Sequence, residues 1–174
     1  MAAIFTDENK TCKIDFSCAV WATDQLNKIF NDSLKDGVLF NVDFIAEYRN
    51  SIFFIEVKNS NFYGVDKPKS FNPLDSQKLR EVAHKYFDSF HYVRGLNKTN
   101  NKQKIYIYLI ETYNGDIALR TALRSRLKDR LPFKLQKSFS ERMIDEVLVL
   151  SFDEWCKKFP QFPLSRLQPQ LTQN

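Results

Sequence analysis

The chain has 174 residues, 43% of them hydrophobic and 27% charged, and its formal net charge is +5. These values are typical of one globular domain with its own core, and we expect a core over residues 15–159 and a tail over 160–174. No apolar run is long enough to cross a membrane, and the start of the chain lacks the features of a secretory signal. We therefore expect a cytoplasmic protein with no membrane partner.

Several kinds of chemistry are disfavoured by the motifs. Cys12, Cys18 and Cys156 show no CxxC spacing, so we expect reduced thiols rather than a zinc site or a disulfide. His84 and His91 lie seven residues apart with no second ligand motif, which favours packing or surface roles. The chain contains no phosphate-binding glycine motif and no Ser/His/Asp arrangement, so use of ATP or a dinucleotide is not expected.

In chain order, the first expected element is an amphipathic helix from Asp15 to about Leu34. Its apolar residues recur at helical spacing, and Asp15 can cap its start. Asp24 lies at the border of the apolar stripe, where it can face a site beside a sheet. Asp36 and Gly37 then end the helix and turn the chain.

Residues 38–58 are predicted to form two strands joined by a short polar turn. The second strand begins with the apolar run 52–55, which is typical of a strand covered on both faces, and ends with the charged Glu56 and Lys58. Charged groups at the edge of a core are kept only when they are paired, hydrogen-bonded or bound to a metal. Glu56 and Lys58 share one face of the strand because they lie two residues apart.

The register of this hairpin decides whether Asp43 joins them. A two-residue turn at 50–51 pairs Arg49 with Ile52, and this places Asp43 opposite Lys58 and diagonal to Glu56, with Cβ separations of about 5 to 8 Å. A three-residue loop would turn Asp43 to the other face. A four-residue turn is the remaining alternative, since Asn-Ser is a weaker hairpin turn than Asn-Gly.

After the hairpin, the polar loop 59–71 has a length that is usually functional or mobile, and it carries Lys67 and Lys69 near the charged strand end. A helix is expected to follow, with Asn72 as its N-cap, Pro73 in its first position and its end near Gly95. The later predicted elements are a strand over 104–112, a helix over 117–131, a strand over 146–151 and a short helix over 152–158.

Two surface features bear on nucleic-acid binding. Residues 116–142 include eight basic and three acidic side chains, and Arg120, Arg124 and Lys128 fall at i, i+4 and i+8 on one helix face. Such a face can neutralise backbone phosphates, although a solvated helix face has the same pattern. Tyr106 and Tyr108 lie in a central strand, and we expect them in the core rather than in a stacking platform.

The Asp43 strand followed by Glu56-Val57-Lys58 across a hairpin resembles the PD-(D/E)xK nuclease superfamily, the restriction-endonuclease-like fold. The predicted order of helix, two strands, loop, helix and strand over about residues 15–112 is similar to that family as well. The resemblance implies an α/β fold with a mixed central sheet flanked by helices. Val42 replaces the proline of the motif.

The resemblance also implies a site and an activity. Asp43, Glu56 and the carbonyl of Val57 would hold Mg²⁺ or Mn²⁺, and Lys58 would lie beside the attacking water and the scissile phosphate. Gln77 is the candidate for the polar residue that some members add from the next helix. Hydrolysis of phosphodiester bonds is the expected activity, with DNA favoured over RNA as the partner. A homodimer is left open, as is the endo- or exonuclease mode of cleavage.

Other functions fit the same residues. The fold could serve as a catalytically inactive nucleic-acid-binding module that uses its basic helix. The chain could also be a protein-interaction domain in which Glu56 and Lys58 form an ordinary salt bridge at the end of the sheet.

Overall fold

A five-stranded mixed sheet forms the centre of the protein, which a computed structural model describes over residues 3–61, 71–113 and 115–168. Its strands are β3 (Trp21–Thr23), β4 (Phe44–Tyr48), β5 (Ser51–Asn59), β6 (Gln103–Glu111) and β7 (Glu146–Leu150), adjacent in that order. The pairs β3–β4 and β4–β5 are antiparallel, while β5–β6 and β6–β7 are parallel. The predicted α/β class with a mixed central sheet is therefore confirmed.

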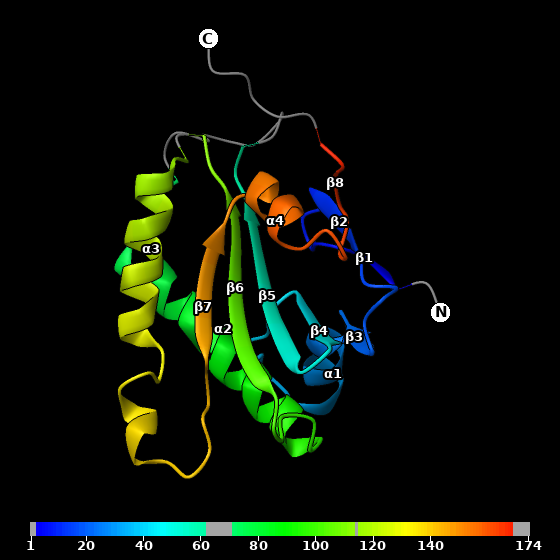
Figure 1. Ribbon diagram of the computed structural model, residues 1–174, viewed down its shortest axis with the longest axis vertical. Coiled ribbons are helices and arrows are strands. Elements are labelled where there is room, and N and C mark those ends of the chain that lie inside the picture. Colours follow the sequence, from blue (N-terminus) through cyan, green and yellow to red (C-terminus); the bar gives the residue numbers. More distant parts are fainter. Residues whose placement is uncertain (1–2, 62–70, 114, 169–174) are drawn as a thin grey trace.

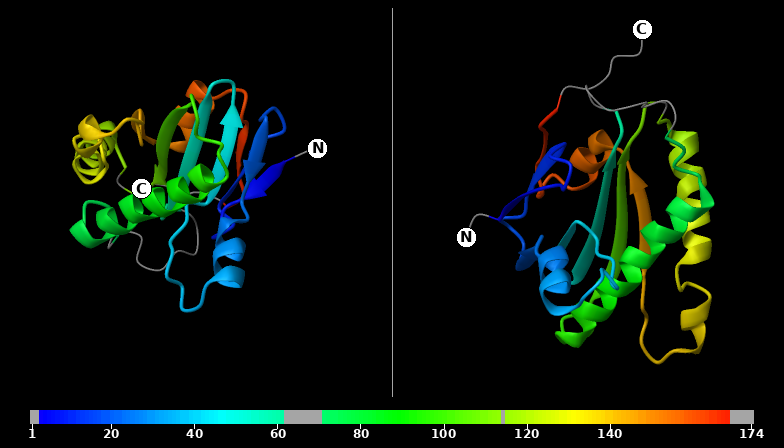
Figure 2. Two further views of the ribbon diagram at one scale, coloured as in Figure 1. Left: turned by 90° about the horizontal axis from the view of Figure 1, so that it is seen from below. Right: turned by 180° about the vertical axis from the view of Figure 1, so that it is seen from behind.

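Helices and a second, smaller sheet cover the two faces of this sheet. One face packs against α1 (Leu26–Ser33), α2 (Ser76–Gly95) and α3 (Ile117–Arg130), and α2 crosses the sheet diagonally (Figures 1 and 2). The other face packs against α4 (Phe152–Lys158) and the antiparallel sheet of β1 (Ile4–Thr6), β2 (Cys12–Asp15) and β8 (Leu164–Arg166). A 3₁₀ turn at Leu135–Ser138 lies between α3 and β7.

The second half of the chain folds as its pattern predicts. The bounds of β6, α3, β7 and α4 agree with the predicted ranges to within one residue at each end. Strand β6 is apolar on both faces because it is central, and Tyr106 and Tyr108 are buried in it as expected. The hydroxyl group of Tyr106 donates to the carbonyl oxygen of Val82 at 2.7 Å, which satisfies its polar end inside the core.

The predicted helix from Asp15 to Leu34 is wrong in its first half. Asp15 ends β2, residues 21–23 form the edge strand β3, and the helix begins only at Leu26. Val20, which the helical spacing counts as a core residue, is 72% exposed. Residues 17–20 form a turn in spite of their helical spacing. The pairing of β3 with β4 overrides the local helical preference of the residues that follow.

Two other boundaries differ from the sequence prediction. Helix α2 is capped by Asp75, whose carboxylate accepts from the backbone N–H groups of Gln77 and Lys78, whereas Asn72 only closes a turn by accepting from Leu74 N–H. The described part of the expected tail also belongs to the fold, because β8 pairs with β2 and Phe162 is fully buried. In the part of the chain that is described, no helix combines the length and apolar character needed to span a bilayer.

Candidate functional site

The turn of the central hairpin lies one residue earlier than predicted. Tyr48 pairs with Ser51, so the turn residues are Arg49 and Asn50, and Arg49 takes a positive φ of 53°. Asn-Ser is therefore not the turn pair, and the pairing of Arg49 with Ile52 is wrong. The loop nevertheless has an even length, so every side chain stays on the face that the prediction gave it.

This register brings Asp43 to Glu56. Phe44 pairs with Ile55, and continuing the ladder by one residue places Asp43 across from Glu56 rather than Lys58. Asp43 Oδ2 accepts a hydrogen bond from the backbone N–H of Val57 at 2.7 Å. The Asp43 carboxylate thus accepts the backbone N–H that a further residue of β4 would otherwise bond. This hydrogen bond fixes the carboxylate at the end of the strand pair.

Glu56 is a buried acid with one unused oxygen. Its side chain is 8% exposed, its Oε1 accepts from Lys85 Nζ at 2.6 Å, and its Oε2 is buried with no hydrogen-bond partner among the described residues. Burial and then the charge of Asp43 raise the pKa of Glu56 from 4.5 to about 8. Burial is also the main reason that the pKa of Asp43 is raised from 3.8 to about 6.

Lys85 is the site residue that the sequence reasoning missed. It lies on α2, beside the buried residues Val82 and Tyr86, and its side chain is 27% exposed. Burial lowers the pKa of Lys85, but the carboxylates of Glu56 and Asp43 outweigh it and leave the pKa above its usual value. The available signal was a lysine next to the apolar stripe of a helix, where a long side chain can reach inward.

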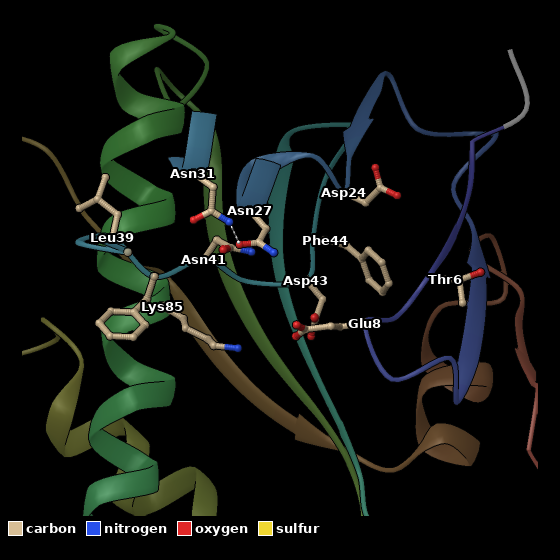
Figure 3. Close-up of a pocket in the computed structure, with 12 residues that line it drawn as sticks. Thr6, Glu8, Asp24, Asn27, Asn31, Leu39, Asn41, Asp43, Phe44 and Lys85 are labelled. Atoms are coloured by element: carbon tan, nitrogen blue, oxygen red, sulfur yellow. Dashed lines mark hydrogen bonds between the residues drawn. The ribbon is translucent and has the colours of Figure 1, made fainter. Parts of the chain in front are cut away.

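Two hollows meet at this cluster. We call the first the Asp43 cavity: it has a volume of about 400 Å³, and Glu8, Asp24, Asp43 and Lys85 bring charged groups to it (Figure 3). We call the second, of about 250 Å³, the Glu56 cavity. Its charged lining residues are Glu56, Lys58, Lys78, Glu81 and Lys85.

Acidic residues from two other segments line the Asp43 cavity. Glu8, between β1 and β2, points toward Asp43, and its charge raises the pKa of Asp43 (Figure 3). Asp24, the acid that the sequence analysis placed nearest a site, lines the same cavity, but its carboxylate points away from Asp43 (Figure 3). Asp24 instead accepts from the side-chain amide of Gln25 at 2.5 Å. Glu8, and not Asp24, is therefore one of the charges that raise the pKa of Asp43.

Of the other predicted site residues, Lys58 lies at the cluster and Gln77 lies apart from it. Lys58 lines the Glu56 cavity, and its Nζ is 5.6 Å from the ring centre of Phe71. Lys78 approaches the same ring at 4.3 Å. Gln77 is exposed and donates from its side chain to Glu81 Oε1 at 3.0 Å.

The basic face of α3 is engaged by the protein itself. The Arg120 side chain is 12% exposed and pairs with Glu154 at 2.8 Å. Arg124 donates to the carbonyl oxygen of Val147 at 2.9 Å, and the Lys128 ammonium lies 5.4 Å from the ring centre of Phe133. A role for these three side chains in phosphate binding stays a prediction. Lys67 and Lys69 lie outside the described residues.

The cluster can be tested for its fit to a divalent cation. Within the described ranges, no group of three or more His, Cys, Asp or Glu side chains is arranged to hold a metal. Mg²⁺, however, usually takes one or two carboxylates and keeps water as its other ligands. Asp43 and Glu56 meet that requirement, and the buried Glu56 Oε2, which no described residue bonds, is an oxygen that could coordinate a cation. The residues therefore fit a water-rich Mg²⁺ or Mn²⁺ site that Lys85 partly occupies.

In comparisons with known proteins, no protein-family model matches the chain, no curated protein sequence matches it, and no solved structure matches its fold.

Proposed function

We propose that the protein is a metal-dependent nuclease that hydrolyses phosphodiester bonds, with DNA favoured over RNA as the substrate. The observation that carries the proposal is the convergence of Asp43, Glu56 and Lys58 at the end of one hairpin. Glu56 is buried, and one of its oxygens has no hydrogen-bond partner among the residues that the structure describes. A buried carboxylate beside a second, half-buried one costs free energy unless a cation compensates them, so such a pair is typical of a functional site. The likeness of this motif to restriction-endonuclease-like proteins supports the same reading.

Each residue has a role in this proposal. Asp43 and Glu56, with the carbonyl oxygen of Val57, would hold the metal, and Val57 N–H orients the Asp43 carboxylate through the 2.7 Å hydrogen bond. A bound Mg²⁺ or Mn²⁺ would supply Lewis-acid polarisation of the phosphate and an acidified water. Lys58 would orient the attacking water and offset the negative charge that develops on the phosphate.

Lys78 and Lys85 add positive charge to the Glu56 cavity, which Lys58 also lines. Both lie on α2 at positions seven residues apart, so they share one helix face with Val82 and line the Glu56 cavity with Lys58. Three ammonium groups around one hollow suit a phosphate group, because each can donate hydrogen bonds to its oxygens. Gln77 does not line the Glu56 cavity, so the proposal gives it no direct contact with the phosphate group.

A cleavage assay with matched variants tests the proposal. Single-stranded and plasmid DNA are incubated with the protein and Mg²⁺, Mn²⁺ or EDTA, beside Lys58→Ala and Glu56→Gln. Glu47→Gln is the control, because Glu47 is also a buried strand acid and pairs with Lys102 at 2.7 Å. We expect cleavage that depends on the metal, is lost in both site variants and is kept in the control. No cleavage, or equal cleavage by Lys58→Ala, would refute the proposal.

A catalytically inactive binding module is the second candidate. The 2.6 Å ion pair between Lys85 and Glu56 favours it, because the ammonium already compensates part of the buried charge without a metal. This alternative predicts retention of DNA that falls with salt but no cleavage with any divalent ion. Absence of DNA binding at all salt concentrations would instead favour a protein-interaction domain.

A further inference from the structure

An exposed aromatic ring stands at the rim of the Asp43 cavity. Phe40 is 42% exposed, and one side of its ring packs on His84, with the ring centres 5.6 Å apart and the planes inclined by 26°. The backbone holds the ring in place: Phe40 N–H donates to Asp88 Oδ2 at 2.9 Å, and Val42 N–H donates to Ser89 Oγ at 3.0 Å. The ring is therefore anchored to α2 at both ends of a short segment.

Side-chain amides line the same cavity. Asn27, Asn31 and Asn41 border it together with Phe40 and Asp43, and Figure 3 shows all three amides around the hollow that Asp43 and Lys85 also reach. Asn31 donates to Asn27 Oδ1 at 3.0 Å, which leaves the Asn31 oxygen and the Asn27 NH₂ group able to bond a ligand. Amides of this kind can pair with the edge of a nucleobase.

The charges on the two sides of the Phe40–His84 pair are different. The Asp43 cavity carries the carboxylates of Glu8, Asp24 and Asp43 against the one ammonium group of Lys85, and this excess of negative charge repels phosphate groups but not a neutral base. On the other side, His84 lines a groove of about 300 Å³ that also has the guanidinium groups of Arg80 and Arg130. This arrangement suits a base in the cavity with its backbone phosphates directed toward the groove.

We propose that the Asp43 cavity binds an unpaired nucleobase, stacked on Phe40 and bonded by Asn27 and Asn31, so that the substrate is single-stranded or locally unpaired nucleic acid. This inference rests on the proposed nuclease function, because it identifies the substrate class of the same site. Exposed rings provide stacking platforms for single strands, whereas the bases of a duplex are stacked on one another and cannot enter.

Binding, rather than cleavage, provides the test. A fluorescein-labelled single-stranded oligonucleotide is titrated with the protein in Mg²⁺, in the Lys58→Ala background, and its integrity is checked on a denaturing gel. Phe40→Leu removes the ring but keeps an apolar side chain, and we expect it to weaken binding by about 5- to 150-fold, the range of one base–aromatic stack. Phe139→Leu is the matched control, because Phe139 is 45% exposed and lines a different cavity.

The outcomes separate the inference from the proposed function. We expect the Phe40→Leu variant to bind an oligonucleotide of abasic sites, or a blunt duplex, as tightly as the protein that keeps Phe40 does. Equal binding of the single strand by both Phe variants, or an equal loss on the abasic oligonucleotide, would overturn the base site and leave metal-dependent cleavage intact. Ring-dependent binding by a protein that cuts nothing would support the base site and refute the nuclease.

Discussion

Glu56→Gln should make the stability of the protein less sensitive to pH. Glu56 has a raised pKa because its folded environment favours the neutral acid, so its contribution to stability is fully present below pH 4.5 and is lost as the pH rises toward 8. The amide of glutamine has the same shape, its oxygen can still accept from Lys85, and it does not titrate. The substitution therefore removes the proton uptake without removing the packing.

The size of the effect follows from the two pKa values. Each pH unit between 4.5 and about 8 costs the folded state of the wild-type protein about 1.4 kcal/mol, because the unfolded chain has lost the proton that folded Glu56 keeps. Between pH 4.5 and pH 7 this is a loss of about 3 kcal/mol from Glu56 alone. Asp43 adds a smaller loss of the same sign between pH 3.8 and about 6, and that part remains in the variant.

Urea denaturation at several pH values measures the difference. With EDTA present, the free energy of unfolding of the wild-type protein should fall between pH 4.5 and pH 7 by about 3 kcal/mol more than that of Glu56→Gln. Parallel curves for the two proteins would show that Glu56 is not a buried acid with a raised pKa. If the proposed metal site is correct, added Mg²⁺ should restore stability to the wild-type protein at pH 7, because it would bind the ionised carboxylates of the folded state.

Two further substitutions test the electrostatics of the fold. Lys85→Met should lower the free energy of unfolding at pH 9 by about 3 kcal/mol, because it leaves Glu56 charged and unpaired. The loss should be much smaller at pH 5. Equal losses at both pH values in urea titrations would contradict this prediction. Arg120→Ala should lower the melting temperature, since it breaks the ion pair between the largely buried Arg120 side chain and Glu154. Arg124→Ala, at a 53% exposed side chain, should instead reduce the salt slope of nucleic-acid binding by about one. Weaker binding by Arg120→Ala with unchanged melting would assign Arg120 to the surface.

The apolar and charged pattern of the strands predicted most of the fold, and it also predicted that Asp43, Glu56 and Lys58 share one face of the hairpin. An apolar run ending in Glu56 and Lys58 predicts a buried strand with charges at its end, and this holds because hydrophobic alternation directly reports burial. The turn was misplaced by one residue, because Arg49 takes a positive φ that propensity assigns to Gly or Asn. Asp43 still reached the correct face, since moving the turn shifted the pairing by two residues and a strand repeats every two.

Contacts between distant elements were the part that the sequence did not predict. Lys85 meets Glu56 only because α2 crosses the sheet at a particular place, and nothing local to residue 85 specifies that crossing. Glu8 reaches Asp43 because the small sheet brings the turn between β1 and β2 to the end of β4. The helix predicted from Asp15 failed for a similar reason, since β3 exists by pairing with β4.

A crystal structure with Mn²⁺ tests the central claim most directly. Manganese scatters anomalously, so an anomalous difference map distinguishes it from water and from lighter ions. We expect one anomalous peak between the carboxylates of Asp43 and Glu56, with Lys85 Nζ moved away from the 2.6 Å contact that it makes with Glu56 Oε1. Saturating Mn²⁺ with no peak at these carboxylates, and with the Lys85–Glu56 ion pair unchanged, would contradict a metal-dependent active site.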